Sequence, residues 1–157
     1  MSETIQVSPL KSITGELAVP GDKSISHRAA ILAGLSNGSC FVENFLSSED
    51  CVNTLRGMAQ LGVRFEVKKG TDDLPVDLVI HGCGGELQAP AGELDCGNSG
   101  TGMCLLSGVL AAQKFDSTLI GDESLSGRPM DRIITPLAKM GAQFETHGAK
   151  PGCAPLQ

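Results

Sequence analysis

An internal repeat constrains the fold of this sequence more than any other feature does. The letters LSSEDCVNTLRGMAQLGVRFE, which begin at Leu46, match LSGRPMDRIITPLAKMGAQFE, which begin at Leu125, at an offset of 79 residues. Within both segments apolar residues recur every three positions, which predicts a helix. A Gly follows each helix as its C-cap, and strands are then predicted over residues 63–67 and 142–146.

The similarity extends upstream at slightly smaller offsets. A strand that enters a Gly turn is predicted over Ala18–Ser24 and again over Leu94–Gly100. A helix and then a strand follow each turn, the helices at 24–35 and 100–113 and the strands at 39–43 and 117–120. Each unit is therefore βαβαββ over nearly 80 residues, longer than the roughly 20–50 residues of common solenoid repeats. We expect a mixed α/β (α+β) fold with helices inside and sheets outside.

The second unit is shorter than the first. In the first unit another strand is predicted over residues 76–81, whereas the second unit stops at Gln157, where the matching strand should begin. A domain that ends inside a strand leaves backbone groups unpaired. We therefore expect a second repeat that is truncated and a natural polypeptide that continues. The alternative is a terminal variant that ends its sheet early.

Composition and charge exclude several classes of protein. The chain carries a net charge of −6 and no cluster of Lys and Arg, which argues against a nucleic-acid binder. Its N-terminus lacks a secretory signal, and no apolar run is long enough to span a bilayer, so we expect a soluble, cytoplasmic protein without membrane contact. The six cysteines include no C-x-x-C pair, which predicts reduced thiols and no zinc ribbon.

The segment PGDKSISHR, residues 20–28, is the first candidate binding site. Gly21 permits a tight turn, and the free N–H groups of the helix that follows attract anions. Lys23 and Arg28 add positive charge, and Ser24 and Ser26 add hydroxyls. The segment is not a Walker A loop. The alternative is a capped helix whose cations face water.

Two further segments precede helices of the second unit. GNSGT, residues 97–101, is a Gly-rich turn in which Ser99 and Thr101 could hold an oxygen-rich ligand or only cap the helix. Further along, Pro129 suits the first position of a helix, which would place Arg128 at the helix start. A cation is unfavourable there unless an anionic ligand offsets it. The alternative is an Arg that faces water.

The remaining polar residues carry weaker signals. Asp50 is interpreted as a structural acid at a helix start. His27, His81 and His147 lack the spacing of metal ligands, and His27 is expected to be solvated beside its helix start. No Ser/His/Asp set or paired acids indicate a hydrolase.

Taken together, three motifs resemble one enzyme family. Leu10–Arg28 resembles the opening of the 5-enolpyruvylshikimate-3-phosphate (EPSP) synthases, in wording nearest to the second-class bacterial enzymes. Gly97–Thr101 and Leu125–Met130 resemble the next two motifs of that family, in order and at similar separations. The family transfers an enolpyruvyl group from phosphoenolpyruvate to shikimate 3-phosphate. The resemblance covers nearly the whole chain.

The resemblance implies a domain assignment. Members have two similar domains, each built of three βαβαββ subdomains, that close on substrate. Residues 1–19 would then be a strand of the other domain, residues 20–96 the first subdomain and residues 97–157 an incomplete second one. It also implies that the rest of the enzyme, in cis or as a second chain, is needed for activity. No metal or organic cofactor is implied.

The resemblance also implies roles for single residues. Lys23 would be catalytic and lie between both substrates. Shikimate 3-phosphate would be bound by Lys23 together with Ser24, Arg28 and Thr101. Two anions held side by side need a cation between them, which Lys23 would supply.

Phosphoenolpyruvate would be bound by Lys23, Gly100 and Arg128. The 5-hydroxyl of shikimate 3-phosphate would attack C2 of protonated phosphoenolpyruvate, and phosphate would leave the tetrahedral product. Without a side chain at Gly100 the pocket would keep room for glyphosate, a competitive inhibitor of the family. Cys104 departs from the pattern, since members usually have Arg there.

Two alternatives stay open at this stage. The UDP-N-acetylglucosamine enolpyruvyl transferases share the fold and reaction type, but their opening usually has Asn after the Lys, where this chain has Ser24. The chain could also be a non-catalytic binding or assembly module, which its abrupt end and Cys104 favour.

Overall fold

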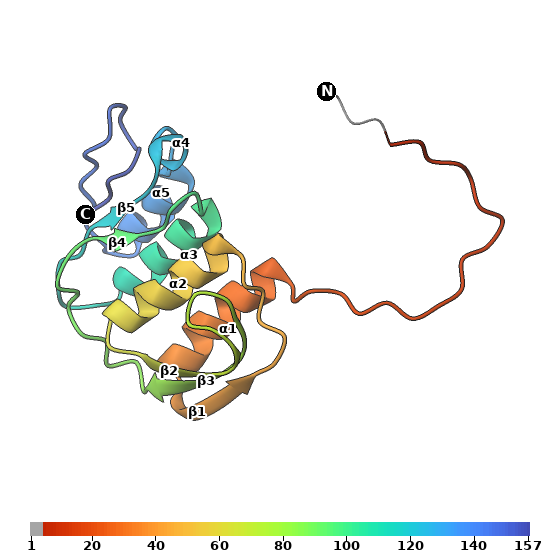
Figure 1. The fold of residues 1–157 in the computed structure, drawn as a ribbon. Coiled ribbons are helices and arrows are strands. Elements are labelled where there is room, and N and C mark those ends of the chain that lie inside the picture. The colour runs from red at the N-terminus through yellow and green to blue at the C-terminus, as the bar shows by residue number, and fades with distance from the viewer. Residues whose placement is uncertain (1–4) are drawn as a thin grey trace.

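The computed structural model describes residues 5–157 as a layer of helices with sheets at two ends (Figure 1). Within these residues lie five helices and five strands. The helices are α1 (Lys23–Leu35), α2 (Glu49–Gln60), α3 (Gly100–Leu110), α4 (Glu123–Ser126) and α5 (Asp131–Lys139). The strands are β1 (Asn37–Val42), β2 (Arg64–Gly70), β3 (Pro75–Cys83), β4 (Leu94–Asp95) and β5 (Leu119–Ile120). The mixed α/β fold predicted from the sequence is confirmed.

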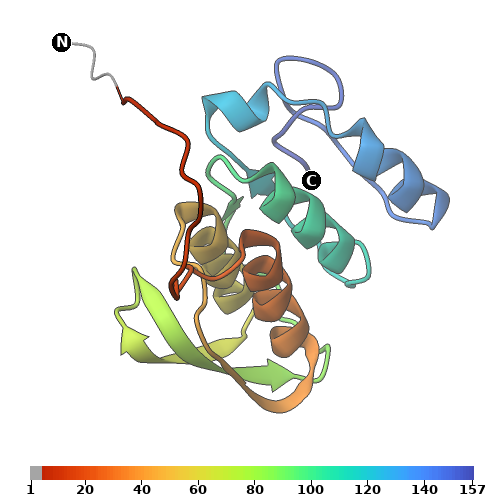
Figure 2. The same cartoon turned by 90° about the vertical axis from the view of Figure 1, so that its right-hand side faces the viewer.

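The first unit pairs two helices with one antiparallel sheet. Its strands run in the order β1-β3-β2, and α1 and α2 cover one face of the sheet (Figure 2). On β3 the side chains of Leu78 and Ile80 are fully buried, as expected for alternate residues that share one face of a strand. They belong to the same core as Leu55 and Met58 of α2. The opposite face of the sheet stays in water.

The second unit repeats this strand order in reduced form. β4 and β5 pair in parallel through Leu94 and Leu119. Leu119 also bridges Leu156, which in turn bridges Thr146, both antiparallel. In the second unit, β5 lies next to residue 156, which lies next to residue 146. This order repeats the order β1-β3-β2 of the first unit. The predicted duplication is therefore confirmed in the topology of the two units.

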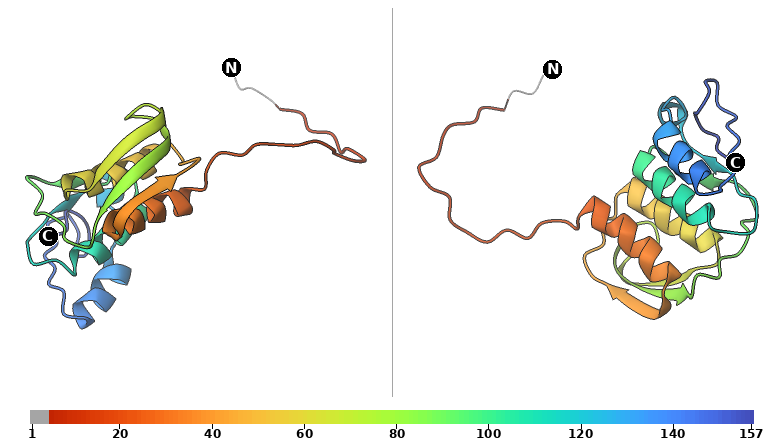
Figure 3. Two further views of the ribbon diagram at one scale, coloured as in Figure 1. Left: turned by 90° about the horizontal axis from the view of Figure 1, so that it is seen from below. Right: turned by 180° about the vertical axis from the view of Figure 1, so that it is seen from behind.

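The four longer helices form one layer. Figure 3 (right) shows α1, α2, α3 and α5 side by side, with α2 between α1 and α3. None of the helices in residues 5–157 is long and apolar enough to cross a membrane.

Some predicted strands and boundaries were wrong. Between residues 5 and 22 there is no strand, because the segment runs away from the helices and has no partner chain beside it (Figure 1). Residues 142–146 contribute only the bridge at Thr146, and α3 ends at Leu110 instead of continuing to Gln113. The last strand expected in the second unit is present only as its beginning, because Leu156, the last residue but one, is buried and pairs with Leu119.

The start of α5 also differs from the prediction. Pro129 precedes the helix, which begins at Asp131 after the N-cap Met130. A separate short helix, α4, comes earlier and ends at the C-cap Gly127. Arg128 therefore lies between α4 and α5, two residues before the N-cap of α5 and not at its first helical position.

His27 and Thr54 form a buried polar contact between α1 and α2. His27 is fully buried and its Nδ1 lies 2.8 Å from the Thr54 hydroxyl, so the expectation that His27 is solvated was wrong. Burial lowers the pKa of His27 below 6.5; the nearby Asp50 carboxylate opposes this shift, and the positive charges of Lys23 and Arg28 add to it.

Gly21 joins the exposed N-terminal segment to α1 through a close backbone contact. A Cβ at Gly21 would lie 1.9 Å from the carbonyl oxygen of Asn44. The Asn44 side chain in turn donates to the carbonyl of Val19, 3.3 Å away. The glycine is therefore required for close approach, rather than for the turn geometry expected from the sequence.

We expect Gly21→Ala to lower the free energy of unfolding by about 1–3 kcal/mol, because backbone must move to admit the methyl group. The matched control is Gly92→Ala, whose Cβ would meet no atom within 4 Å. Urea unfolding followed by circular dichroism compares the two. Equal midpoints for both variants would contradict the contact with Asn44.

The burial of His27 predicts a pH-dependent stability. Because its folded pKa lies below 6.5, the unfolded chain takes up a proton first as the pH falls. The contribution of neutral, buried His27 to the free energy of unfolding is complete above about pH 6.5. Below that pH it decreases by up to about 1.4 kcal/mol per pH unit. The measurement is the free energy of unfolding from pH 7.5 to 5, with His27→Asn as the control that lacks this titration. Parallel curves for wild type and His27→Asn would refute the prediction.

Candidate active site

The candidate site lies where three helices begin side by side. Lys23, the first residue of α1, forms an ion pair with Asp50 in the first turn of α2. The start of α3 lies against α2, because a Cβ at Gly102 would come within 2.9 Å of the Thr54 hydroxyl. Helix starts present unpaired backbone N–H groups and the positive end of the helix dipole, so this grouping favours an anionic ligand.

Lys23 is held by Asp50 but remains open to solvent. Half of the Lys23 side chain is exposed, compared with 20% of Asp50. The sequence interpretation of Asp50 as an acid in the first turn of its helix is confirmed. Its pairing with Lys23 was missed, because it depends on how α1 lies against α2.

Ser24 and Arg28 lie on another side of α1. Both are exposed, and the Arg28 guanidinium donates to the carbonyl of Ser24, 3.0 Å away. Ser26, proposed as a hydroxyl ligand, is instead buried, and its Oγ donates to Asp22 O and accepts from the N–H of Leu46. Ser26 therefore has a structural role, and only Ser24 offers its hydroxyl to a ligand.

At the start of α3, one residue caps the helix and the two residues after it are partly or fully exposed. Ser99 is buried, and its Oγ accepts from the N–H of Gly102 at 2.9 Å, which confirms the N-cap alternative and excludes Ser99 as a ligand. Thr101 is exposed and Gly100 partly so. A Cβ at Gly100 would lie 3.6 Å from Nη1 of Arg128, so these two residues border the same space.

Arg128 is positioned by neutral groups. Its Nη2 donates to Asn98 Oδ1 at 2.6 Å and to Ser124 Oγ at 3.1 Å. The other end of the Asn98 amide donates to the carboxylate of Asp122 at 2.7 Å, and this bond is the main cause that lowers the pKa of Asp122. Asn98 was not singled out from the sequence, because only the folded chain reveals its contact with Arg128.

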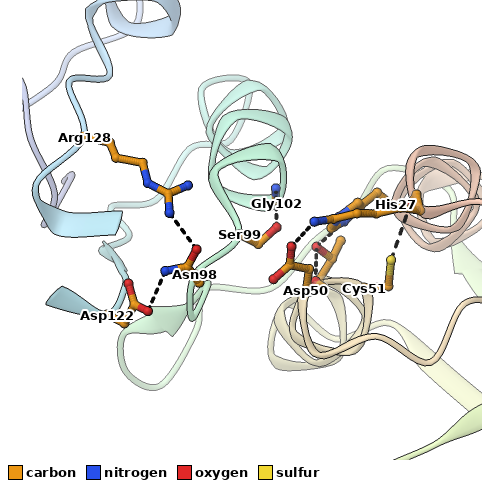
Figure 4. A network of polar contacts seen from close by, with 10 residues as sticks. His27, Asp50, Cys51, Asn98, Ser99, Gly102, Asp122 and Arg128 are labelled. Carbon is orange, nitrogen blue, oxygen red and sulfur yellow. Dashed lines mark hydrogen bonds and ion pairs between the residues drawn. The ribbon is translucent and has the colours of Figure 1, made fainter. Parts of the chain in front are cut away.

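The structure brings the two cations to either side of α3. Figure 4 shows Ser99, at the start of α3, between Arg128 on one side and Asp50 and His27 on the other. Lys23 lies with Asp50, so Lys23 and Arg128 flank the partly exposed Gly100 and the exposed Thr101.

The cysteines and acids offer no other chemistry. All six cysteines are free thiols, and burial raises the pKa of Cys96 to about 12. Cys104 is partly buried on α3. Among residues 5–157, no three His, Cys, Asp or Glu side chains are grouped to hold a metal ion.

Comparison with known proteins finds relatives in one enzyme family. Residues 7–157 match the family model of EPSP synthase (3-phosphoshikimate 1-carboxyvinyltransferase). A 3-phosphoshikimate 1-carboxyvinyltransferase of Akkermansia muciniphila is 58% identical over 148 residues, which are 94% of this chain and 34% of the relative. One of Xanthomonas campestris pv. campestris (strain B100) is 50% identical over 147 residues, 93% of this chain and 32% of the relative.

A solved structure shares the fold as well. The EPSP synthase from Acinetobacter baumannii superposes with a TM-score of 0.81 and 48% sequence identity, over 90% of this chain and 31% of its own. The chain thus spans about a third of the length of the relatives it matches. With a family model that matches nearly all of its residues, the chain belongs to the EPSP synthase family.

Proposed function

We propose that this chain supplies part of the substrate site of a 3-phosphoshikimate 1-carboxyvinyltransferase, which transfers the enolpyruvyl group of phosphoenolpyruvate to shikimate 3-phosphate. The observation that carries the proposal is the pair of cations that flanks one helix start. Lys23 lies on the α2 side of α3, and Arg128 borders Gly100 on the other side. Two phosphate-bearing anions that bind next to each other need this distribution of charge.

Lys23 lies between both substrates in this proposal. Its ammonium is half exposed, and Asp50 fixes its position. A flexible lysine would lose side-chain entropy on binding, whereas one already held by a carboxylate loses less. Lys23 would stabilise the negative charge that develops as the two substrates join.

Shikimate 3-phosphate would lie along the starts of α1 and α3. Ser24 and Arg28 are exposed one turn apart on α1, and Thr101 is exposed on the first turn of α3. Hydroxyl and guanidinium donors of this kind bind phosphate and sugar-like hydroxyl groups.

Phosphoenolpyruvate would lie between Gly100 and Arg128. Arg128 is bound through neutral oxygens of Asn98 and Ser124, and no carboxylate of residues 5–157 forms a direct ion pair with it. The guanidinium is therefore available for a carboxylate or phosphate of the ligand.

The reaction is an addition followed by an elimination. The 5-hydroxyl gives up its proton as its oxygen bonds to C2 of phosphoenolpyruvate and C3 gains a proton, and the C2–O bond to phosphate then breaks as C3 loses a proton. Residues of this chain would orient the two anions and stabilise their charge. The groups that move the protons would come from the remaining part of the enzyme.

The remaining two thirds of the enzyme would dock on apolar surfaces that this chain leaves open. A groove of about 540 Å³ between α1 and α3 is lined largely by apolar side chains, among them Leu32, Leu35, Leu105 and Val109. None of the residues of α5 is fully buried, although its Ile133 and Ile134 pack against the core. The relatives are about three times as long as this chain, which supports the rest of the enzyme as the partner that covers these surfaces, either in the same polypeptide or as a separate chain.

The exposed N-terminal segment fits the same division into domains. Its apolar side chains are largely exposed, with exposed fractions between 66% and 86% at Ile5, Val7, Leu10, Ile13, Leu17 and Val19. We propose that residues 1–19 form a strand of the other domain, that residues 20–96 form the first subdomain and that residues 97–157 form part of the second.

The function is tested by completing the enzyme with the missing two thirds of the 58% identical Akkermansia relative. We expect phosphate release from the completed enzyme and none from the chain alone. Lys23→Met should lower kcat/KM by about 10²–10³, the loss typical of one group that stabilises transition-state charge. Lys114→Met removes an exposed lysine elsewhere and is the control. A completed enzyme that is inactive would favour a non-catalytic binding module, and a fully active Lys23→Met variant would remove Lys23 from the proposed site.

A second test concerns the space beside Arg128. A methyl group at Gly100 meets Arg128 Nη1 at 3.6 Å and Leu125 at 3.7 Å, ordinary contact distances, so Gly100→Ala should fold normally. It would still fill space in the phosphoenolpyruvate pocket, and we expect it to weaken glyphosate inhibition of the completed enzyme by about tenfold or more. The measurement is the inhibition constant of glyphosate for wild type and variant. Equal constants would contradict the placement of Gly100 in the phosphoenolpyruvate pocket.

A further inference from the structure

The buried pair His27–Thr54 lies directly beneath the ion pair Lys23–Asp50. His27 comes four residues after Lys23 on α1, and Thr54 comes four residues after Asp50 on α2. Both pairs therefore join residues 27 apart in the chain, one helical turn below the other. Both contacts depend on the same register of α1 against α2; Lys23 is half exposed at the site, whereas His27 and Thr54 are buried in the core.

The direction of the hydrogen bonds fixes the protonation of His27. The hydroxyl of Thr54 donates its one hydrogen to the carbonyl of Asp50, 3.3 Å away. With the hydrogen of His27 on Nδ1, this nitrogen donates to the Thr54 oxygen at 2.8 Å, whereas the other tautomer would leave a buried N–H at Nε2 unpaired. This leaves Nε2 without a hydrogen, buried and without a hydrogen-bond partner among the described residues.

A second proton on His27 would have no acceptor. It would leave a buried, charged N–H group unpaired at Nε2, which is strongly unfavourable. The charged groups nearby are Asp50 on α2 and Lys23 and Arg28 on α1, and burial outweighs the attraction of Asp50. The imidazole is thus neutral, and it donates a hydrogen bond to Thr54 without accepting one from it.

Thr54 also touches the third helix of the site. A Cβ at Gly102 would come within 2.9 Å of both Thr54 Oγ1 and Ser99 Oγ, so the first turn of α3 rests directly on Thr54. His27, Thr54 and Gly102 therefore form the buried point at which α1, α2 and α3 meet.

We propose that His27 is a positioning residue: its neutral imidazole, bonded to Thr54, sets the register of α1 against α2 and so holds Lys23 beside Asp50 at the entrance of the candidate site. Apolar side chains alone tolerate sliding and repacking, whereas a hydrogen bond requires one alignment. A slip of one helical turn would displace Lys23 by about 5.4 Å. The link to catalysis rests on the proposed function; the link to the position of Lys23 does not.

The test compares the 157-residue chain with three single variants and with the double variant His27→Leu/Thr54→Val. His27→Leu fills the space without a donor, Thr54→Val keeps the branched shape without a hydroxyl, and His27→Asn keeps an N–H donor near the position of Nδ1. The measurement is the rate at which limiting acetic anhydride acetylates Lys23, followed by mass spectrometry, because an ammonium held by a carboxylate reacts more slowly. Lys68, which forms an ion pair with Glu66 on the sheet, is the internal control.

We expect His27→Leu and Thr54→Val each to raise the rate at Lys23 by roughly two- to fivefold, the effect of losing a partly exposed ion pair. The double variant should be no faster than either single variant, since both remove one contact. His27→Asn should retain the wild-type rate, and Lys68 should react equally in all chains.

Two results would overturn the proposal. An unchanged rate at Lys23 in both His27→Leu and Thr54→Val would show that Lys23 does not depend on this contact. A rate that rises equally at Lys23 and Lys68 would indicate general loosening instead of a change in register. If the completed wild-type enzyme releases no phosphate, the proposed function fails, and the acetylation rates still decide whether His27 positions Lys23.

Discussion

The packing of α1 against α2 is the contact on which the rest of this structure depends. Together the two helices cover β3 and bury Leu78 and Ile80, so they fix the core of the first unit. The same packing places the start of α3 against Thr54, which brings the second unit into line with the first. Because the units repeat one topology, the starts of α1, α2 and α3 lie side by side, and the anion attraction of three helix starts would combine there.

Charge is distributed unevenly across that site. Lys23 faces a carboxylate, Asp50, whereas Arg128 is held by the neutral oxygens of Asn98 and Ser124. In the proposed site, the Arg128 side of α3 would therefore attract an anion more strongly, because the guanidinium has no direct ion pair among residues 5–157. On the Lys23 side of α3, a bound anion would compete with Asp50 for the ammonium group. Binding there would therefore depend on several weaker hydrogen-bond donors together. The acidic net charge of −6 has no bearing on this local arrangement.

The repeat made the helices of both units and their order predictable, because the apolar period of each helix is a local property. Contacts across helices could not be predicted in the same way. Asp50 and Asn98 gain their contacts with Lys23 and Arg128 only once α1, α2 and α4 are packed. His27 is a polar residue of a kind that usually faces water, yet it lies in the core. Strands were predicted poorly where they need a distant partner, as at residues 142–146 and in the N-terminal segment.

The most direct test of this account is the response of the backbone amide signals of the chain to shikimate 3-phosphate in a two-dimensional NMR titration. The account predicts saturable shifts at the first turns of α1 and α3, including Lys23, Ser24 and Thr101, with Arg128 joining when phosphoenolpyruvate is added. Shifts that are absent, or that gather on the outer face of the β1-β3-β2 sheet, would contradict a shared anion site at the three helix starts.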